Sequence, residues 1–298
     1  MKILITGVNG LLGQKLVELL LLEDTVELIG TGRGTNRTIL EDDQYRVMNV
    51  EDREEVLKVL QEVKPDSVIH TAAMTQVDDC ELDHKACDRA NVAAVENIVR
   101  GCEIIEAHLV HLSTDFIFDG SEGPLSEEAI PGPVNYYGEA KLKAEEIVKN
   151  SRLRWAIART VLVYGVVSGL QRSNIILWVK ESLEQGKPLQ IVDDQWRTPT
   201  LAEDLAMGCW LLANSKATGV FNISGEDFLT PYDMAMQVVD YFKLDGKLIS
   251  RANSTTFKQP AKRPAKTGFI ITKARKTLGY KPHSFSEAIA LIANQIKE

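Results

Sequence analysis

Tyr137 and Lys141 are the two side chains whose types and spacing first indicate chemistry. They are four positions apart and follow Pro133, so a helix that begins near Asn135 would place both on one face. A phenol with a pKa of about 10 is a poor acid or base at neutral pH. An ammonium group about 4 Å away favours the phenolate by roughly 4 kcal/mol, which would bring the phenol near neutrality. The pair therefore predicts acid–base catalysis.

Ser113 and Thr114 supply two hydroxyl groups at the end of an apolar run expected to form a strand. Open parallel sheets bind their ligands at the carboxyl ends of the strands. A hydroxyl there can donate a hydrogen bond to a carbonyl oxygen and share the negative charge that develops on it. Together with Tyr137, these hydroxyls predict chemistry at a carbonyl group.

Three glycines, Gly7, Gly10 and Gly13, lie between the first strand-like run and the first helix-like run. One glycine permits a tight turn, another lets the backbone approach a pyrophosphate, and the last lets helix and strand pack closely. The N-terminus of the following helix offers free N–H groups and a partial positive charge to the phosphates. This strand–turn–helix context predicts a dinucleotide-binding loop.

The end of the second strand indicates which dinucleotide binds. NAD-binding folds carry an acid about 20 residues after the loop, where it holds the ribose 2′-hydroxyl. Residues 31–37 contain no acid, but they include Arg33 and Arg37, and an arginine can pair with a 2′-phosphate. We therefore expect NADP(H) as the cofactor, with Arg33 at the 2′-phosphate and NAD(H) as the alternative.

Short runs rich in Val, Ile and Leu alternate with helical periodicity through the first two thirds of the chain. Such runs are typical of strands buried on both faces. We expect an α/β fold, a Rossmann-type doubly wound parallel sheet with a smaller C-terminal substrate-binding lobe. The expected sheet strands are Ile3–Thr6, Val26–Gly30, Tyr45–Asn49, Ser67–Thr71, His108–Ser113 and Trp155–Thr160. The helices expected between them are Gly13–Leu22, Asp52–Val63, Lys85–Cys102 and Tyr136–Asn150.

The alternation loosens after Gly165, which suggests two domains. Residues 1–165 would form the NADP(H)-binding domain and residues 166–298 the substrate-binding lobe, with segments around 189–223 returning to the sheet. The elements expected here are a loop over Val166–Gln171, helices over Ser173–Gln185, Thr230–Phe242 and Ser284–Lys297, and strands over Leu189–Val192 and Val220–Ile223.

Composition argues against several classes of function. The 34 Lys and Arg against 42 Asp and Glu give a net charge of -8, the opposite of what a non-specific nucleic-acid binder needs. No apolar run approaches the ~18 residues of a membrane span, and the chain enters a strand at once, which leaves no room for a signal peptide. The four cysteines lack the paired spacing of a zinc site. We expect a cytoplasmic protein with free, buried thiols and no metal, nucleic-acid or membrane partner.

The glycine loop, the hydroxyls after the fifth strand and the Tyr137–Lys141 pair occur in an order that resembles the extended short-chain dehydrogenase/reductases. The resemblance covers nearly the whole chain. His70–Ala73 is similar to the Asn-Ala-Ala segment beside the nicotinamide in that family, and Asn91-Val92 is similar to its fourth-helix motif. The segments similar to the dTDP-4-dehydrorhamnose reductase group of the family are Val77–Glu81, Ser113–Gly120 and Val192–Thr200.

The resemblance implies a reaction, which is the NADPH-dependent reduction of the C4 ketone of a nucleotide-linked 4-keto-6-deoxy sugar. Tyr137 would protonate the sugar oxygen, Lys141 would hold the nicotinamide ribose, and Thr114 would polarise the ketone. The other implied substrate-binding residues are Ser113, which could replace Thr114, Asp115 and Arg263. The implied cofactor-binding residues are Gly7, Gly10, Leu11, Leu12, Gly13, Arg33, Thr71, Ala72, Ala73, Tyr137 and Lys141. A homodimer would also fit the family.

Three departures from the reductases keep other functions open, and the first is that Arg263–Phe269 differs from the usual C-terminal segment of the reductases. Val161-Leu162 stands where the reductases often carry Ser-Trp, and His70 stands where the family has Asn. A nucleotide-sugar epimerase would use the same Tyr–Lys pair. Some proteins of this fold resemble the regulatory subunit of methionine adenosyltransferase, which keeps the dinucleotide site but acts as a binding partner. Phe116 stands where the related dehydratases carry a Glu, which argues against dehydration.

Overall fold

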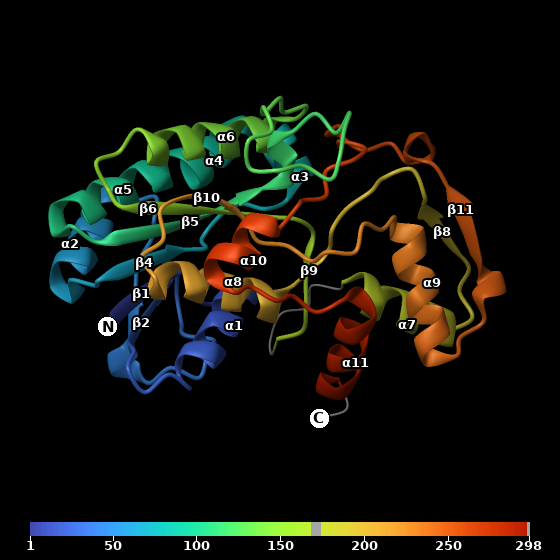
Figure 1. Ribbon diagram of the computed structural model, residues 1–298, viewed down its shortest axis with the longest axis horizontal. Helices are drawn as coiled ribbons and strands as arrows, with labels where there is room; N and C mark the ends of the chain where they lie inside the picture. Colours follow the sequence, from blue (N-terminus) through green and yellow to red (C-terminus); the bar gives the residue numbers. More distant parts are fainter. Residues whose placement is uncertain (168–173, 297–298) are drawn as a thin grey trace.

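The structure is a computed structural model that describes residues 1–167 and 174–296. Within them, seven parallel strands form one central sheet in the order β10-β6-β5-β4-β1-β2-β3 (Figure 1). The strands are β1 (Lys2–Thr6), β2 (Glu27–Gly32), β3 (Tyr45–Val47), β4 (Ser67–His70), β5 (His108–Thr114), β6 (Trp155–Thr160) and β10 (Gly219–Asn222). The strand order reverses at β1, and ligands bind at such a switch point. The predicted doubly wound sheet is confirmed.

Helices cover both faces of the sheet because its strands are apolar on both sides. Ile3 and Ile5 point into one core and Leu4 into the other, as the two-residue period of a strand requires. One face is covered by α1 (Leu11–Leu20), α8 (Ala202–Asn214) and α10 (Thr272–Leu278), and the other by α2 (Arg53–Val63), α5 (Ala94–Ile105) and α6 (Tyr136–Lys149) (Figure 1).

A smaller lobe lies beside the sheet (Figure 1). Its helices share a separate apolar core, which includes Val179, Val238 and Ile289. Its elements are α7 (Ile175–Glu184), α9 (Pro231–Phe242), α11 (Phe285–Gln295) and a parallel pair formed by β8 (Leu189–Val192) and β11 (Ile249–Ala252). The lobe places a second wall opposite the carboxyl ends of the sheet strands.

The chain passes between the sheet and the lobe more than once. β10 joins the sheet edge beside β6, and α8 packs on α1, so this part of the chain does return to the sheet. β8, which the sequence suggested might return with it, pairs with β11 in the lobe instead. A short parallel pair, β7 (Val163–Tyr164) with β9 (Thr200–Leu201), lies at the crossing between the two regions.

Most predicted elements form, but one predicted helix is divided, and the structure also contains elements that the sequence did not predict, chiefly α8, α10 and β11. The helix expected over Lys85–Cys102 is divided into α4 (His84–Asp88), a π-helical turn over Arg89–Ala93 and α5. A π turn inserts a residue into the helical repeat, so apolar periodicity does not reveal it. A further short helix, α3 (Val77–Leu82), precedes α4. Residues 168–171 of the predicted loop, together with Ser173 and Lys297, lie outside the described residues.

Candidate functional site

A cleft of about 1400 Å³ lies at the carboxyl ends of the sheet strands and is lined from both the sheet and the lobe. It brings together nearly all of the site residues predicted from the sequence. These are Gly7, Gly10, Leu11, Leu12, Gly13, Arg33, Thr71, Ala72, Ala73, Thr114, Asp115, Tyr137, Lys141 and Arg263. Ser113 does not line the cleft.

The glycine loop has the shape that a pyrophosphate needs. Gly7 has a φ of 72°, and a Cβ on Gly13 would lie 2.4 Å from the Gly7 carbonyl oxygen, so neither position accepts a larger residue without strain. α1 begins at Leu11 with no side-chain cap on its first N–H groups and no acid in its first turn. Its N–H groups therefore point at the cleft with a partial positive charge, and this fits an anionic dinucleotide.

The wall beyond the loop consists of the backbone from Thr71 to Met74, and it is held from both sides. The Thr71 hydroxyl donates to the Thr6 carbonyl at 2.6 Å, and the Ala72 N–H donates to the Thr6 hydroxyl at 3.3 Å. Asn91, in the π turn, accepts from the Met74 N–H and donates to the Met74 carbonyl, both at 2.9 Å. The π turn thus positions the cleft wall.

Tyr137 lies in the first turn of α6, where the Asn135 side chain caps the helix by accepting from the Gly138 N–H at 2.9 Å. Burial raises the pKa of the Tyr137 phenol above its ordinary value, while the neighbouring Thr114 side chain opposes that rise. The lowered phenol pKa expected from Lys141 is therefore not observed, because the effect of burial on the phenol exceeds the effect of Thr114. The phenol holds its proton at neutral pH, which is the state of a general acid.

Lys141 lies on the same face of α6, as its spacing predicted, and its Nζ donates to the Leu112 carbonyl at 2.6 Å. Burial lowers the pKa of Lys141 to about 8, against the attraction of Glu145. Glu145 accepts two hydrogen bonds from Arg159, at 2.9 and 2.8 Å. Burial alone would raise the pKa of the Glu145 carboxyl, but these bonds hold it below its ordinary value, so a buried anion remains one helical turn from Lys141.

Ser113 faces away from the cleft because successive strand residues point to opposite sides of a sheet. Its hydroxyl lies beside Glu145 under α6, where it helps to lower the pKa of that carboxyl. Thr114, the next residue, lines the cleft and lies within hydrogen-bonding reach of Tyr137. The structure therefore assigns the cleft hydroxyl to Thr114, and Ser113 is not placed to substitute for it.

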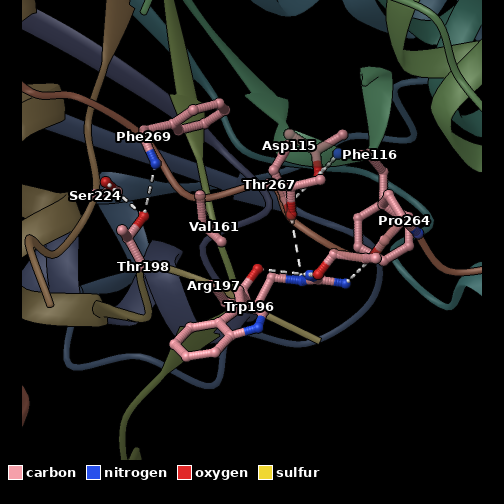
Figure 2. A network of polar contacts seen from close by, with 12 residues as sticks. Asp115, Phe116, Val161, Trp196, Arg197, Thr198, Ser224, Pro264, Thr267 and Phe269 are labelled. Atoms are coloured by element: carbon pink, nitrogen blue, oxygen red, sulfur yellow. Dashed lines mark hydrogen bonds and ion pairs between the residues drawn. The ribbon is translucent and has the colours of Figure 1, made fainter. Parts of the chain in front are cut away.

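Asp115 is a buried carboxylate that joins three segments of the chain (Figure 2). Its Oδ1 accepts from the Thr114 hydroxyl at 3.1 Å, its Oδ2 accepts from the Thr267 hydroxyl, and Arg197 Nε lies 3.6 Å from Oδ2. Burial raises the pKa of Asp115, and the charge of Arg197 opposes the rise. Asp115 was predicted as a substrate contact, and in the structure it lines the cleft with its oxygens occupied by the protein.

The two arginines nearest this end of the cleft are also held by the protein. Arg197 donates to the carbonyls of Trp196 and Pro264 at 2.7 and 2.6 Å (Figure 2), and to the Ala265 carbonyl at 3.0 Å. Arg263 makes a bidentate pair with Asp78, at 2.5 and 2.7 Å, and lowers the pKa of that carboxyl. Arg263 was predicted as a substrate contact, and it reaches the cleft wall, but a substrate anion would compete with Asp78 for it.

Several cleft residues were not singled out from the sequence, among them Gln195 and Arg197. The sequence contains one signal for these two residues, because the segment 192–200 resembles the dTDP-4-dehydrorhamnose reductase group. That resemblance assigned no role to the side chains of the segment. Asn9 was also missed, although it lies inside the glycine loop. Its side chain donates to the Thr35 carbonyl at 3.0 Å and accepts from the Arg37 N–H at 2.9 Å, so it fastens the arginine-bearing loop to the glycine loop.

His70, which replaces the family's Asn, is not a metal ligand in this arrangement. Its Nδ1 lies 2.8 Å from the Thr6 hydroxyl, and its ring stacks on His111 with centroids 5.7 Å apart. Among the described residues, no group of three or more His, Cys, Asp or Glu could hold a metal ion, and no helix is long and apolar enough to cross a membrane. The four cysteines are free and buried, as predicted.

Comparison with known proteins extends these observations to the whole chain. The family model described as RmlD substrate binding domain matches residues 1–298. Methionine adenosyltransferase 2 subunit beta of Rattus norvegicus is 31% identical over 248 residues, which cover 82% of this chain and 72% of that protein. A probable low-salt glycan biosynthesis reductase, Agl14 of Haloferax volcanii, is 28% identical over 97% of this chain and 96% of its own length. The crystal structure of a dTDP-4-dehydrorhamnose reductase from Clostridium acetobutylicum covers 100% of both chains with a TM-score of 0.88 and 27% identity.

Proposed function

The chain belongs to the RmlD substrate binding domain family, and we propose that it reduces the C4 ketone of a nucleotide-linked 4-keto-6-deoxy sugar with NADPH. The observation that carries this proposal is the convergence of Thr114, Tyr137 and Lys141 on the cleft that holds the glycine loop. The similarity to the Haloferax and Clostridium reductases supports the same class of reaction. The cleft also exceeds the ~300–1,000 Å³ of most ligand pockets, which suits a dinucleotide beside a second ligand.

The proposed roles follow from the protonation states in the cleft. The reduced nicotinamide, when bound, supplies a hydride to the ketone carbon. Tyr137, whose buried phenol is protonated, donates its proton to the ketone oxygen, and the Thr114 hydroxyl hydrogen-bonds that oxygen as negative charge develops on it. Lys141, one turn further along α6, would hold the ribose hydroxyls of the cofactor, and its ammonium group would stabilise the phenolate that remains.

NADP(H) binding is proposed on the residues that would hold each part of the cofactor. The N–H groups at the start of α1 would bind the pyrophosphate, and Gly7 and Gly13 would leave room for it. Thr71, Ala72 and Ala73 would line the ribose and nicotinamide end, and Arg33 would lie at the adenosine end.

The test is NADPH oxidation, followed by absorbance, with a panel of nucleotide-linked 4-keto-6-deoxy sugars. Tyr137→Phe should lower kcat by about 10²- to 10⁴-fold, the range of one general acid, while NADPH still binds. Tyr136→Phe is the matched control, because the Tyr136 hydroxyl donates to Asp88 at 2.8 Å and Tyr136 does not line the cleft. Equal activity of the two variants, or no oxidation with any sugar of the panel, would rule out the proposal.

A second candidate rests on the 31% identity to the beta subunit of methionine adenosyltransferase 2. In that case the chain would bind a catalytic partner instead of reducing a sugar. The test is size-exclusion chromatography with a purified methionine adenosyltransferase catalytic subunit. A stable complex without NADPH oxidation would favour this candidate, and turnover without a complex would favour the reductase.

A further inference from the structure

The adenosine end of the cleft contains an acid that the linear sequence did not place there. Glu51 follows β3, and its carboxylate lies between two arginines from other segments. Arg33 Nη1 is 3.8 Å from one oxygen and Arg89 Nε is 3.6 Å from the other. All three side chains line the cleft. Residues 31–37, at the end of β2, contain no acid. The carboxylate that lies beside Arg33 in this loop therefore comes from Glu51.

The contacts of Glu51 with the arginines are loose. Both distances exceed hydrogen-bonding range, and the Arg33 and Arg89 side chains are 75% and 60% exposed. Exposed ion pairs of this kind contribute little to stability, so either arginine can exchange the carboxylate for another anion at small cost. The pair nevertheless places one negative charge where a second anion would approach.

The loop that carries Arg33 is held in place before any ligand arrives. Asn9 bonds the backbone of Thr35 and Arg37, and the Tyr45 hydroxyl donates to the Gly34 carbonyl at 3.0 Å. Arg89 is fixed on a different element, the π turn that also positions the wall of the cleft. The two guanidinium groups therefore approach the same point from two separately anchored backbones.

We propose that Glu51, Arg33 and Arg89 form one recognition site for the adenosine ribose, in which Glu51 limits the preference for NADP(H) over NAD(H). A 2′-phosphate would take charge-assisted hydrogen bonds from the arginines and be opposed by Glu51. A free 2′-hydroxyl would donate to the Glu51 carboxylate, as an acid does in NAD-binding folds. The inference rests on the dinucleotide-binding part of the proposed function and not on the reduction step.

The experiment measures the dissociation constants of NADP⁺ and NAD⁺ by isothermal titration calorimetry, without any sugar. The preference for NADP⁺ is the dissociation constant of NAD⁺ divided by that of NADP⁺. Glu51→Gln should raise this ratio by about tenfold, and Arg89→Gln should lower it by a similar factor. Glu62→Gln and Arg46→Gln are matched controls, because this partly exposed pair, at 3.2 Å, lies outside the cleft and carries the same charges. Both controls should leave the ratio within about twofold of the wild type.

An unchanged ratio in Glu51→Gln, or a change as large in Glu62→Gln, would overturn the inference. Failure of the wild type to bind either dinucleotide would overturn both the inference and the proposed function. Binding that shifts as expected in a protein that reduces no sugar would support the inference and reject the reductase alone.

Discussion

The hydroxyl of Thr114 donates a hydrogen bond to the carboxylate of Asp115, with 3.1 Å between Oγ1 and Oδ1. The Phe116 N–H donates to the same Thr114 oxygen at 3.2 Å. A hydroxyl has one proton to donate, so Thr114 must release Asp115 before it can donate to a ketone. Thr267 and Arg197 also satisfy the Asp115 carboxylate, which makes that release possible without stranding a buried charge.

Thr267→Val is therefore expected to lower the kcat of ketone reduction by about tenfold, which corresponds to about 1.4 kcal/mol of barrier. Without the Thr267 hydroxyl, Asp115 would hold the Thr114 proton more firmly. Steady-state kinetics should show the loss in kcat with the KM for NADPH unchanged. Thr267→Ser keeps the hydroxyl and should retain activity close to the wild type, and equal loss in both variants would contradict the coupling.

The pH dependence of kcat/KM should show the titration of Lys141. Burial lowers the pKa of Lys141 to about 8, so its charge is present below that pH and is lost as the pH rises through it. We expect kcat/KM for reduction, measured from pH 6 to 10, to fall above about pH 8, since this quantity reports groups of the free enzyme. Lys143→Met, which changes a lysine off that helix face, should keep the break, and a profile flat to pH 10 would contradict the assignment.

The stacked pair of His70 and His111 should make the fold sensitive to acid. Burial, with the charge of Lys141 second, lowers the pKa of His70 to about 3 and that of His111 well below its ordinary value. The unfolded chain takes up these protons near pH 6.5 and the folded chain does not. The free energy of unfolding should therefore fall by roughly 1 kcal/mol per pH unit for each histidine as the pH drops below 6.5.

Urea unfolding at several values between pH 5 and 7 measures this slope. His111→Gln should remove the contribution of one histidine, whereas His84→Gln, at an exposed position, should leave the slope unchanged. Parallel slopes for the wild type and His111→Gln would show that the buried imidazole does not control acid stability.

The ion pair of Arg159 with Glu145 should be costly to break. Both side chains are almost fully buried, at 2% and 0% exposed. Arg159→Met removes both hydrogen bonds from the guanidinium to the buried Glu145 carboxylate, which keeps the partly exposed Lys149, at 2.8 Å, as its ionic partner. The substitution should lower the free energy of unfolding by up to about 3–5 kcal/mol. Adding Glu145→Leu should recover most of that loss, which a double-mutant cycle by chemical unfolding would measure. Arg275→Met, in the exposed pair with Glu226, should cost less than about 1 kcal/mol.

The sequence by itself determined the sheet strands, the glycine loop and the helix that carries Tyr137 and Lys141. These features depend on local chemistry. Apolar runs predict strands buried on both faces, and a four-residue spacing after the Asn135 cap places two side chains on one helix face. The apolar periodicity of the sequence does not reveal loops or π turns. In those segments the predicted boundaries differ from the boundaries in the structure.

The tertiary structure alone decided which distant groups meet in the cleft. It placed Glu51 and Arg89 beside Arg33, turned Ser113 under α6, and buried Tyr137 so that its phenol pKa rises rather than falls. The physical reason is that strand order and the repeated passage of the chain between sheet and lobe bring together segments far apart in sequence. Burial and the charges of those neighbours then set each pKa and each available hydrogen bond.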